Sequence, residues 1–333
     1  MITVWMAVYN EEKHLAETIN SVLAQSFRDF QFVISDNHST DKSAEIIDLF
    51  AKKDPRIIRV KPEKHCHSNQ HAEFIYEIIL PRFSNKYSIH IGGHDLWDPL
   101  YLQILFQMAE NYPDSSIVYG QGYDMAYEDN KIIGKFDDHI VSSEIIKPII
   151  PHLLLLGLRV NIVFFGLVRE DIRKQCIWRH HCVGSDHLFI TDMALMGKIL
   201  FEPSAKFYLR RSKDHGNLSA YGKRHLSQNN SNSYNDFLKQ LEWVNYLINK
   251  AINLSSNPDL YSHPKIKSML TISLLYGYII RYLPNLNVFD TDGIQNFFNR
   301  PELLHLFEAN GEIQKYLEQL IVDNLSATNS YVD

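Results

Sequence analysis

The first part of the chain alternates short apolar runs with a helical pattern. Residues 2–8 form an apolar run of the length and composition of a buried parallel strand. Asn10 is a suitable N-cap for a following helix, and the two acids after it suit a helix N-terminus. A second apolar run covers residues 30–34. Between the two strands, four apolar residues share one helix face: Leu15, Ile19, Val22 and Leu23.

Polar residues follow both predicted strands. Tyr9, Asn10, Glu11 and Glu12 come after the first strand, and residues 35–41 come after the second. In an open α/β sheet, ligands bind in the crevice beyond the carboxyl ends of the strands. We therefore expect a nucleotide site at this edge. A dinucleotide site or a P-loop would need a glycine-rich turn after the first strand, and the sequence has none there.

Further along the chain, the pattern continues as an α/β protein. Short apolar runs predict strands at residues 57–60, 86–91 and 116–120, and a helix is predicted over residues 72–80. Residues 62–71 are polar and rich in histidine, which is typical of a loop.

Composition narrows the class of protein. The 333 residues are 45% hydrophobic and 22% charged, as in an ordinary globular protein with a sizeable core. The net charge of −6 argues against a nucleic-acid partner and a polybasic membrane surface. Three cysteines indicate reduced thiols and a cytoplasmic setting. The chain enters a strand at once, so we expect no secretory signal.

The longest apolar stretch covers residues 149–167 and contains Pro151, His152, Arg159 and Asn161. Charged and amide side chains are costly in lipid, so we interpret this stretch as core or acceptor-site structure rather than a membrane span. Attachment to the inner face of the cell membrane stays open.

Three segments together resemble the start of family 2 glycosyltransferases, which have the GT-A fold. They are residues 8–12, 21–27 and 35–41, and their order and spacing match the family. The resemblance covers about residues 1–220. It implies a GT-A domain over residues 1–222, with a Rossmann-like, mostly parallel central sheet flanked by helices. A helical region over residues 223–333 follows, and for that part we have only periodicity.

The resemblance assigns a nucleotide site to the polar residues at the sheet edge. It implies that the base and ribose of a nucleotide-sugar donor contact residues after the first two strands, and that Gly93 and Arg211 lie nearer the diphosphate. Guanidinium groups bind phosphate in a bidentate manner, so Arg210 is a further candidate. The residues after the first two strands are Val8, Tyr9, Glu11, Asp36 and Asn37.

The family's acidic metal-binding cluster is altered in this chain. Relatives have three acids before a Leu-Trp-x-Pro segment, and a helix follows it. Here Gly93, His94 and Asp95 precede Leu96, and the resemblance implies the helix over residues 101–111. Mg²⁺ and Mn²⁺ prefer carboxylate oxygens, and Mn²⁺ also tolerates imidazole. We expect Asp95 and His94, with His215 as a further ligand, to hold Mn²⁺ or Mg²⁺, with nucleotide affinity falling below about pH 6. The alternative is a site that has lost its metal dependence.

The resemblance also implies a catalytic base. The acid at the position of Asp186 heads a helix in the family and accepts the proton of the acceptor hydroxyl. Inverting transfer needs one such carboxylate, whereas a glycosidase needs a pair. The alternative is a simple helix N-cap at Ser185 and Asp186.

Two other groups of residues leave alternatives open. A zinc site is conceivable among residues 176–187, but the cysteine spacing lacks a Cys-x-x-Cys pair. In the C-terminal region, residues 269–280 are apolar nearly all round, as in a helix buried in a bundle; a homodimer interface or peripheral membrane contact is the alternative.

Taken together, these features predict an inverting glycosyltransferase. The donor is expected to be a UDP-sugar, and the acceptor a glycan or lipid-linked hydroxyl in bacterial surface polysaccharide synthesis, both by resemblance alone. Two other classes are weighed against it. A degenerate, non-catalytic family member would bind the donor or a glycan without transfer, and a nucleotidyltransferase would need a glycine-rich basic loop after the first strand.

Overall fold

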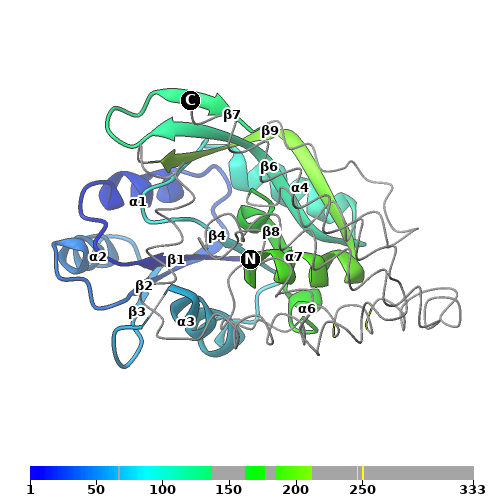
Figure 1. Cartoon of the computed structure of the whole chain (residues 1–333), viewed down its shortest axis with the longest axis horizontal. Coiled ribbons are helices and arrows are strands. Elements are labelled where there is room, and N and C mark those ends of the chain that lie inside the picture. Colours follow the sequence, from blue (N-terminus) through cyan, green and yellow to red (C-terminus); the bar gives the residue numbers. More distant parts are fainter. Residues whose placement is uncertain (67, 137–161, 177–184, 212–245, 247–249, 251–333) are drawn as a thin grey trace, which may run out of the picture. The chain divides into compact units, whose positions relative to one another are not determined.

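A computed structural model describes residues 1–66, 68–136, 162–176, 185–211, 246 and 250 (Figure 1). The chain divides into two compact units, one comprising Met1–Lys147 with Val160–His215 and the other Pro148–Arg159 with Gly216–Asp333. All described residues except Tyr246 and Lys250 belong to the first unit. The predicted boundary at residue 222 and the predicted C-terminal helices lie outside the described residues.

The predicted strand–helix–strand unit is confirmed at the N-terminus. Strand β1 (Ile2–Val8) and strand β2 (Phe30–Asp36) pair in parallel, with Val8 opposite Asp36 at their carboxyl ends. Helix α1 (Leu15–Leu23) connects them and buries Leu15, Thr18, Ile19 and Val22, while Leu23 is half-buried. The apolar periodicity therefore identified the packed face of this helix.

Asn10 is not the N-cap of α1. The helix begins at Leu15, with His14 as its N-cap residue. Asn10 instead has φ of 56°, a left-handed conformation that asparagine adopts more readily than most residues. The chain thus makes a turn directly after β1, and the acids at positions 11 and 12 lie in that turn rather than in the helix.

The described strands form one nine-stranded sheet in the order β3-β2-β1-β4-β8-β6-β9-β5, with β7 paired to β6. Strands β1 to β4 run parallel, and β8 is antiparallel to both β4 and β6. This confirms the α/β class with a Rossmann-like parallel half. The remaining strands are β3 (Ile57–Val60), β4 (Tyr87–His90), β5 (Leu96–Trp97), β6 (Ser115–Ala126), β7 (Ile132–Lys135), β8 (Leu167–Arg169) and β9 (Lys198–Arg211).

The helices cover both faces of the parallel half, with α1 and α2 on one side and α3 on the other (Figure 1). Helix α4 has the predicted bounds. The helix predicted over residues 72–80 begins earlier, at Ser68, and becomes a π-helix from Phe74. The further elements are α2 (Ser43–Ala51), α3 (Ser68–Glu73), η1 (Phe74–Ile79), η2 (Leu80–Arg82), α4 (Tyr101–Asn111), η3 (Val163–Phe165), α6 (Glu170–Arg173) and α7 (Ser185–Met196).

Candidate functional site

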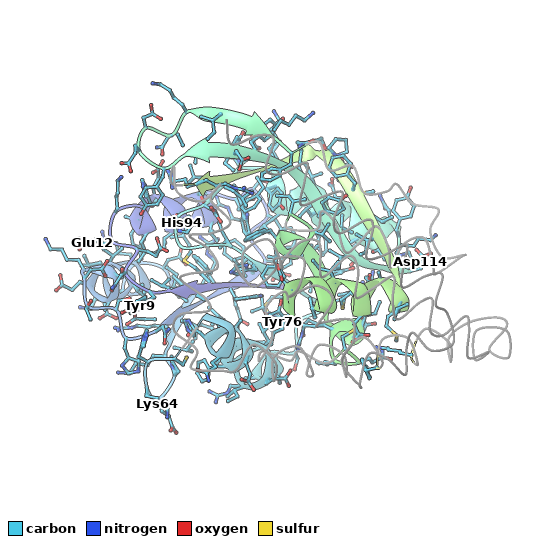
Figure 2. The ribbon with its side chains drawn as sticks, in the orientation of Figure 1. Tyr9, Glu12, Lys64, Tyr76, His94 and Asp114 are labelled. Atoms are coloured by element: carbon cyan, nitrogen blue, oxygen red, sulfur yellow. The ribbon has the colours of Figure 1, made fainter. Side chains whose placement is uncertain are left out.

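The two polar loops that follow β1 and β2 are bonded to each other, as predicted. The Asn37 amide donates to the Val8 carbonyl (2.8 Å), and the Asn10 amide donates to Ser39 Oγ (3.1 Å). In return, the Thr40 amide donates to Asn10 Oδ1 (2.8 Å). These bonds cross from one loop to the other, so the loops form one polar rim at the carboxyl ends of the parallel strands. Tyr9, Glu12 and His94 lie at this end of the sheet, and Asp114 lies at the other (Figure 2).

Asp36 ends β2 in a buried position, with 3% of its surface exposed. Its Oδ1 accepts a hydrogen bond from the Ser39 amide (3.0 Å), and its Oδ2 lies 3.5 Å from Nη2 of Arg59. Arg59 also pairs with Asp48. The carboxylate is therefore fixed at the strand end, and its oxygens can accept further hydrogen bonds from a ligand.

The Asn37 side chain builds the neighbouring loop. Its Nδ2 donates to the Cys66 carbonyl (2.6 Å), and its Oδ1 accepts from the Cys66 amide (3.0 Å). Both polar atoms of the amide are thus bonded to the loop after β3. A direct contact between Asn37 and a nucleotide stays a prediction; its observed contacts fix residues 61–66 beside Asp36.

An aromatic pair stands at the same edge. The rings of Tyr9 and His65 lie 4.6 Å apart between centroids, and Tyr9 is 46% exposed. His65 Nδ1 lies 2.9 Å from the Asn37 carbonyl, which only accepts, so Nδ1 carries the proton. Residues 62–66 form a loop, as predicted, whereas residues 68–71 of the predicted loop belong to α3. Tyr9 and His65 form a tilted aromatic pair at this edge, with 44° between the ring planes.

The altered acidic cluster forms a turn after β4. His94 Nδ1 lies 3.0 Å from Glu11 Oε1, and because a carboxylate only accepts, Nδ1 is the donor. His94 Nε2 lies 3.9 Å from Asp95 Oδ1, which is too far for a hydrogen bond. A Cβ on Gly93 would lie 2.9 Å from Glu11 Cγ. The missing side chain at position 93 therefore leaves the space that Glu11 occupies.

The charges around His94 set its protonation. Burial would lower the pKa of His94, but the hydrogen bond to Glu11 and the charge of Asp95 outweigh it and raise that pKa to about 9. Burial also raises the pKa of the Asp95 carboxyl, while the positive charge of His94 and the Arg210 amide act against that rise. Without a competing cation, His94 is therefore an imidazolium at neutral pH.

Two donor atoms in this turn are of kinds that divalent cations accept at phosphate sites. Across the described ranges, no three His, Cys, Asp or Glu side chains form a full ligand set. Mg²⁺ and Mn²⁺ at phosphate sites take only one or two protein ligands, however. His94 Nε2 and Asp95 Oδ1 are two such donors, and a carboxylate on the other ring nitrogen is the usual partner of a metal-binding histidine. His215 lies outside the described residues.

The two arginines at the end of β9 differ in their surroundings. Arg210 is fully buried and donates to Asn130 Oδ1 (2.8 Å) and to the His94 carbonyl (2.6 Å). Arg211 Nε lies 2.7 Å from Asp124 Oδ1, and its guanidinium lies over the Phe136 ring. Neither contact involves the rim formed by the β1 and β2 loops. A phosphate contact by Arg211 stays a prediction.

Asp186 lies in the first turn of α7 and is half-buried, so the expectation that it heads a helix is confirmed. Aromatic contacts connect this helix to β1. Phe189 lies 5.3 Å from Tyr76, and Tyr76 lies 5.1 Å from Trp5, between ring centroids. Its role as a base stays a prediction. In the candidate zinc cluster, Cys176 is buried, and His180, His181 and Cys182 lie outside the described residues.

Tyr127 is a site residue that the sequence did not indicate. It lies in the β6–β7 loop, with its ring 4.4 Å from His14 and 6.0 Å from His94. Lys13 Nζ lies 4.6 Å from the same ring. Nothing in the local pattern marks this residue, because the sheet alone brings the loop to β1 and α1.

Comparisons with known proteins agree with this geometry. Residues 3–176 match the model of glycosyl transferase family 2. The protein named uncharacterized glycosyltransferase MJ1057 of Methanocaldococcus jannaschii is 33% identical over 125 residues, 37% of this chain and 42% of that protein. The putative teichuronic acid biosynthesis glycosyltransferase TuaG of Bacillus subtilis is 28% identical over 138 residues, 41% of this chain and 52% of that protein. The matched segments thus span less than two thirds of these relatives.

A solved structure shows the same fold. TarS residues 1–349 of S. aureus, crystallised with UDP-GlcNAc, superpose with a TM-score of 0.58 at 14% identity, covering 97% of this chain and 88% of that one. None of the helices in the described ranges has the length and apolar character needed to cross a bilayer. The sheet, the paired polar loops and the family match lead to one conclusion: the chain is a member of glycosyl transferase family 2 with the GT-A fold.

Proposed function

We propose that this protein transfers a sugar from a nucleoside-diphosphate donor to a hydroxyl of a glycan or lipid-linked acceptor, with inversion at the anomeric carbon. The observation that carries the proposal is the single rim formed by the β1 and β2 loops, to which Glu11 joins the turn at His94 and Asp95. The reaction belongs to bacterial surface polysaccharide synthesis, the kind of process that the name of TuaG gives for that relative. The proposed place of the reaction is the cytoplasm.

The rim divides into two parts with different chemistry. Tyr9 offers an aromatic face, and Asp36 offers a carboxylate held by Ser39 and Arg59, which suits a nucleoside base with N–H donors. His94 and Asp95, with Glu11 behind them, suit a diphosphate with its cation. Val8, Asn37, Gly93 and Arg211 complete the proposed nucleotide site.

Mn²⁺ or Mg²⁺ is proposed as cofactor. Asp95 and His94 would hold it, with His215 as a further ligand, and the bound cation would offset negative charge on the departing diphosphate. An imidazole in place of a carboxylate favours Mn²⁺ over Mg²⁺. The pairing of Glu11 with His94 is the feature of this chain that prepares the imidazole for that role.

Asp186 is proposed as the general base. The acceptor oxygen attacks the anomeric carbon while the bond from that carbon to the diphosphate oxygen breaks. The Asp186 carboxylate takes the proton of the acceptor hydroxyl, and the diphosphate leaves with the bonding electron pair. Direct displacement from the opposite face inverts the configuration.

A non-catalytic binder is the second candidate, favoured by the replacement of two acids at Gly93 and His94. One experiment separates the candidates. Thermal shift and calorimetry with UDP, GDP, CDP and dTDP, each with Mn²⁺ or with EDTA, identify the nucleotide; UDP-GlcNAc is the first sugar donor to test. Slow hydrolysis of the bound donor supports the enzyme, if NMR shows that the anomeric configuration of the released sugar is inverted. Tight binding with no turnover on any acceptor supports the binder.

A further inference from the structure

The buried guanidinium of Arg210 connects three segments that are distant in the sequence. Its Nε donates to Asn130 in the β6–β7 loop (2.8 Å), and its Nη1 donates to the His94 carbonyl in the turn after β4 (2.6 Å). Its Nη2 donates to Glu17 on α1. The same residue's amide donates to Asp95 Oδ1 (3.0 Å). Arg210 thus contacts both residues of the altered acidic cluster.

This arrangement leaves Arg210 without access to a ligand. Its side chain has no exposed surface, and its three nitrogens are all bonded to protein oxygens. A phosphate oxygen has no route to a guanidinium in that position, so the alternative of a direct diphosphate contact by Arg210 does not fit the structure. A buried guanidinium whose nitrogens all donate to protein oxygens is suited instead to fixing the segments that carry those oxygens.

The β6–β7 loop is bonded to this residue beside the site. Asn130 has φ of 59° and holds both Arg210 and, through Nδ2 at 3.3 Å, Glu17. The loop carries Tyr127, whose ring lies 6.0 Å from His94. Asn130 is thus held against α1 and the turn after β4 by a hydrogen-bond network with Arg210 at its centre, while Tyr127 contacts His94 through its ring.

We propose that Arg210 is the positioning residue of the diphosphate site: it fixes the His94–Asp95 turn and the β6–β7 loop against each other, without contacting the ligand. The inference rests on the proposed function, because it assigns the diphosphate to that turn. It separates Arg210 from Arg211, whose contacts with Asp124 and Phe136 lie elsewhere. Loss of Arg210 should therefore weaken diphosphate binding far more than nucleoside binding.

The test compares Arg210→Met with Arg169→Met. Arg169 is also a buried guanidinium bonded to protein oxygens, the carbonyls of Ser115 (2.9 Å) and Ala109 (3.1 Å). Ser115 follows Asp114, which lies at the far end of the sheet in Figure 2. Both variants should lose thermal stability, since each removes a bonded buried cation. Only Arg210→Met should change the ligand site.

The readout is the ratio of UDP to UMP affinity, measured by calorimetry with Mn²⁺ below the melting temperature of each variant. We expect Arg210→Met to lower this ratio by about tenfold or more, the usual effect of removing a partner behind a ligand shell. Arg169→Met should leave it unchanged. Hydrogen exchange should rise in peptides covering residues 92–95 and 126–131 of Arg210→Met and not in those of Arg169→Met.

Two further variants cover the case in which Arg210→Met does not fold. Arg210→Lys keeps the charge and loses the fork, and Asn130→Gly keeps a left-handed backbone and removes one acceptor. Each should lower the ratio by about threefold or more, roughly the worth of one net hydrogen bond. An unchanged ratio in every folded variant overturns the role of Arg210 while the proposed function stands. A wild-type protein that binds none of UDP, GDP, CDP and dTDP overturns both.

Discussion

The Glu11 carboxylate lies 3.0 Å from Nδ1 of His94, although the two residues are 83 positions apart in the chain. Glu11 is in the turn after β1, where the Ser43 Oγ atom accepts its amide hydrogen (2.8 Å), so its backbone is fixed as well. The carboxylate therefore orients the imidazole and leaves Nε2 on the side of Asp95. The Glu11 side chain lies where a side chain at position 93 would be, because a Cβ there would be 2.9 Å from Glu11 Cγ.

The first prediction concerns pH. The pKa of His94 is raised to about 9, so a cation must displace a proton from Nε2 at neutral pH. Protonation opposes ligation; hence Mn²⁺-dependent nucleotide affinity should rise about tenfold per pH unit from pH 6 and level off near pH 9. The pH at which the affinity levels off is therefore higher than the value near 6 expected for an unperturbed imidazole. Calorimetry across that range measures it.

His94→Asp is the control for that profile, because it has no imidazole to titrate. Its affinity should be flat above pH 6, with a shift in preference toward Mg²⁺. A wild-type profile that is also flat between pH 7 and pH 9 would show that His94 takes no part in cation binding.

The second prediction concerns Glu11. Glu11→Gln keeps an acceptor for Nδ1 and removes the negative charge, so the pKa of His94 should fall and the midpoint of the affinity profile should move down by about one pH unit or more. Glu12→Gln is the matched control, since the Glu12 carboxylate accepts from the Lys42 amide (3.0 Å) instead. NMR titration of the imidazole resonances checks both variants, and identical curves for the two would contradict the assignment.

The third prediction concerns the base and ribose site. Asp36→Ala should weaken binding of a nucleoside diphosphate by roughly 1.5–3 kcal/mol, the usual worth of a charge-assisted hydrogen bond. Asp48→Ala removes the other acid that pairs with Arg59 and should leave affinity unchanged. Equal affinities for wild type and Asp36→Ala in calorimetry would place the base elsewhere.

The fourth prediction concerns Asp186, the proposed general base of the reaction. Asp186→Asn should retain donor binding and lower the rate of transfer by about 10²-fold or more, as expected when a general base is lost. Single-turnover kinetics with bound donor separates binding from chemistry. A rate within a few-fold of the wild-type rate would remove Asp186 from the mechanism.

Local patterns predicted the elements that carry strong periodicity. β1 and β2 were evident as apolar runs, and the resemblance to the family gave the observed bounds of α4. The N-terminus of α1 was not predicted correctly, because Asn10 is a common N-cap residue but here adopts a left-handed conformation in a turn. The change from α- to π-helix at Phe74 likewise has no local sign in the sequence.

Of the site, the sequence predicted only the residues that directly follow the strands. The rim of the β1 and β2 loops follows from parallel pairing, which sets Val8 opposite Asp36. The pairing of Glu11 with His94 and the burial of Arg210 depend on contacts over 83 and 116 positions, which no local window contains. Arg210 and Arg211 are neighbours of the same type, and only the side of the strand on which each lies separates their surroundings.

The central claim is that a nucleoside diphosphate and its cation bind at the His94–Asp95 turn. The most direct measurement is a crystal structure of the protein with UDP and Mn²⁺ at pH 8.5, with anomalous data collected at the manganese edge. The account predicts one anomalous peak bonded to Asp95, to His94 Nε2 and to the diphosphate, with the base beside Tyr9 and Asp36. A bound diphosphate at another edge of the sheet, or at this turn with no anomalous peak, would contradict it.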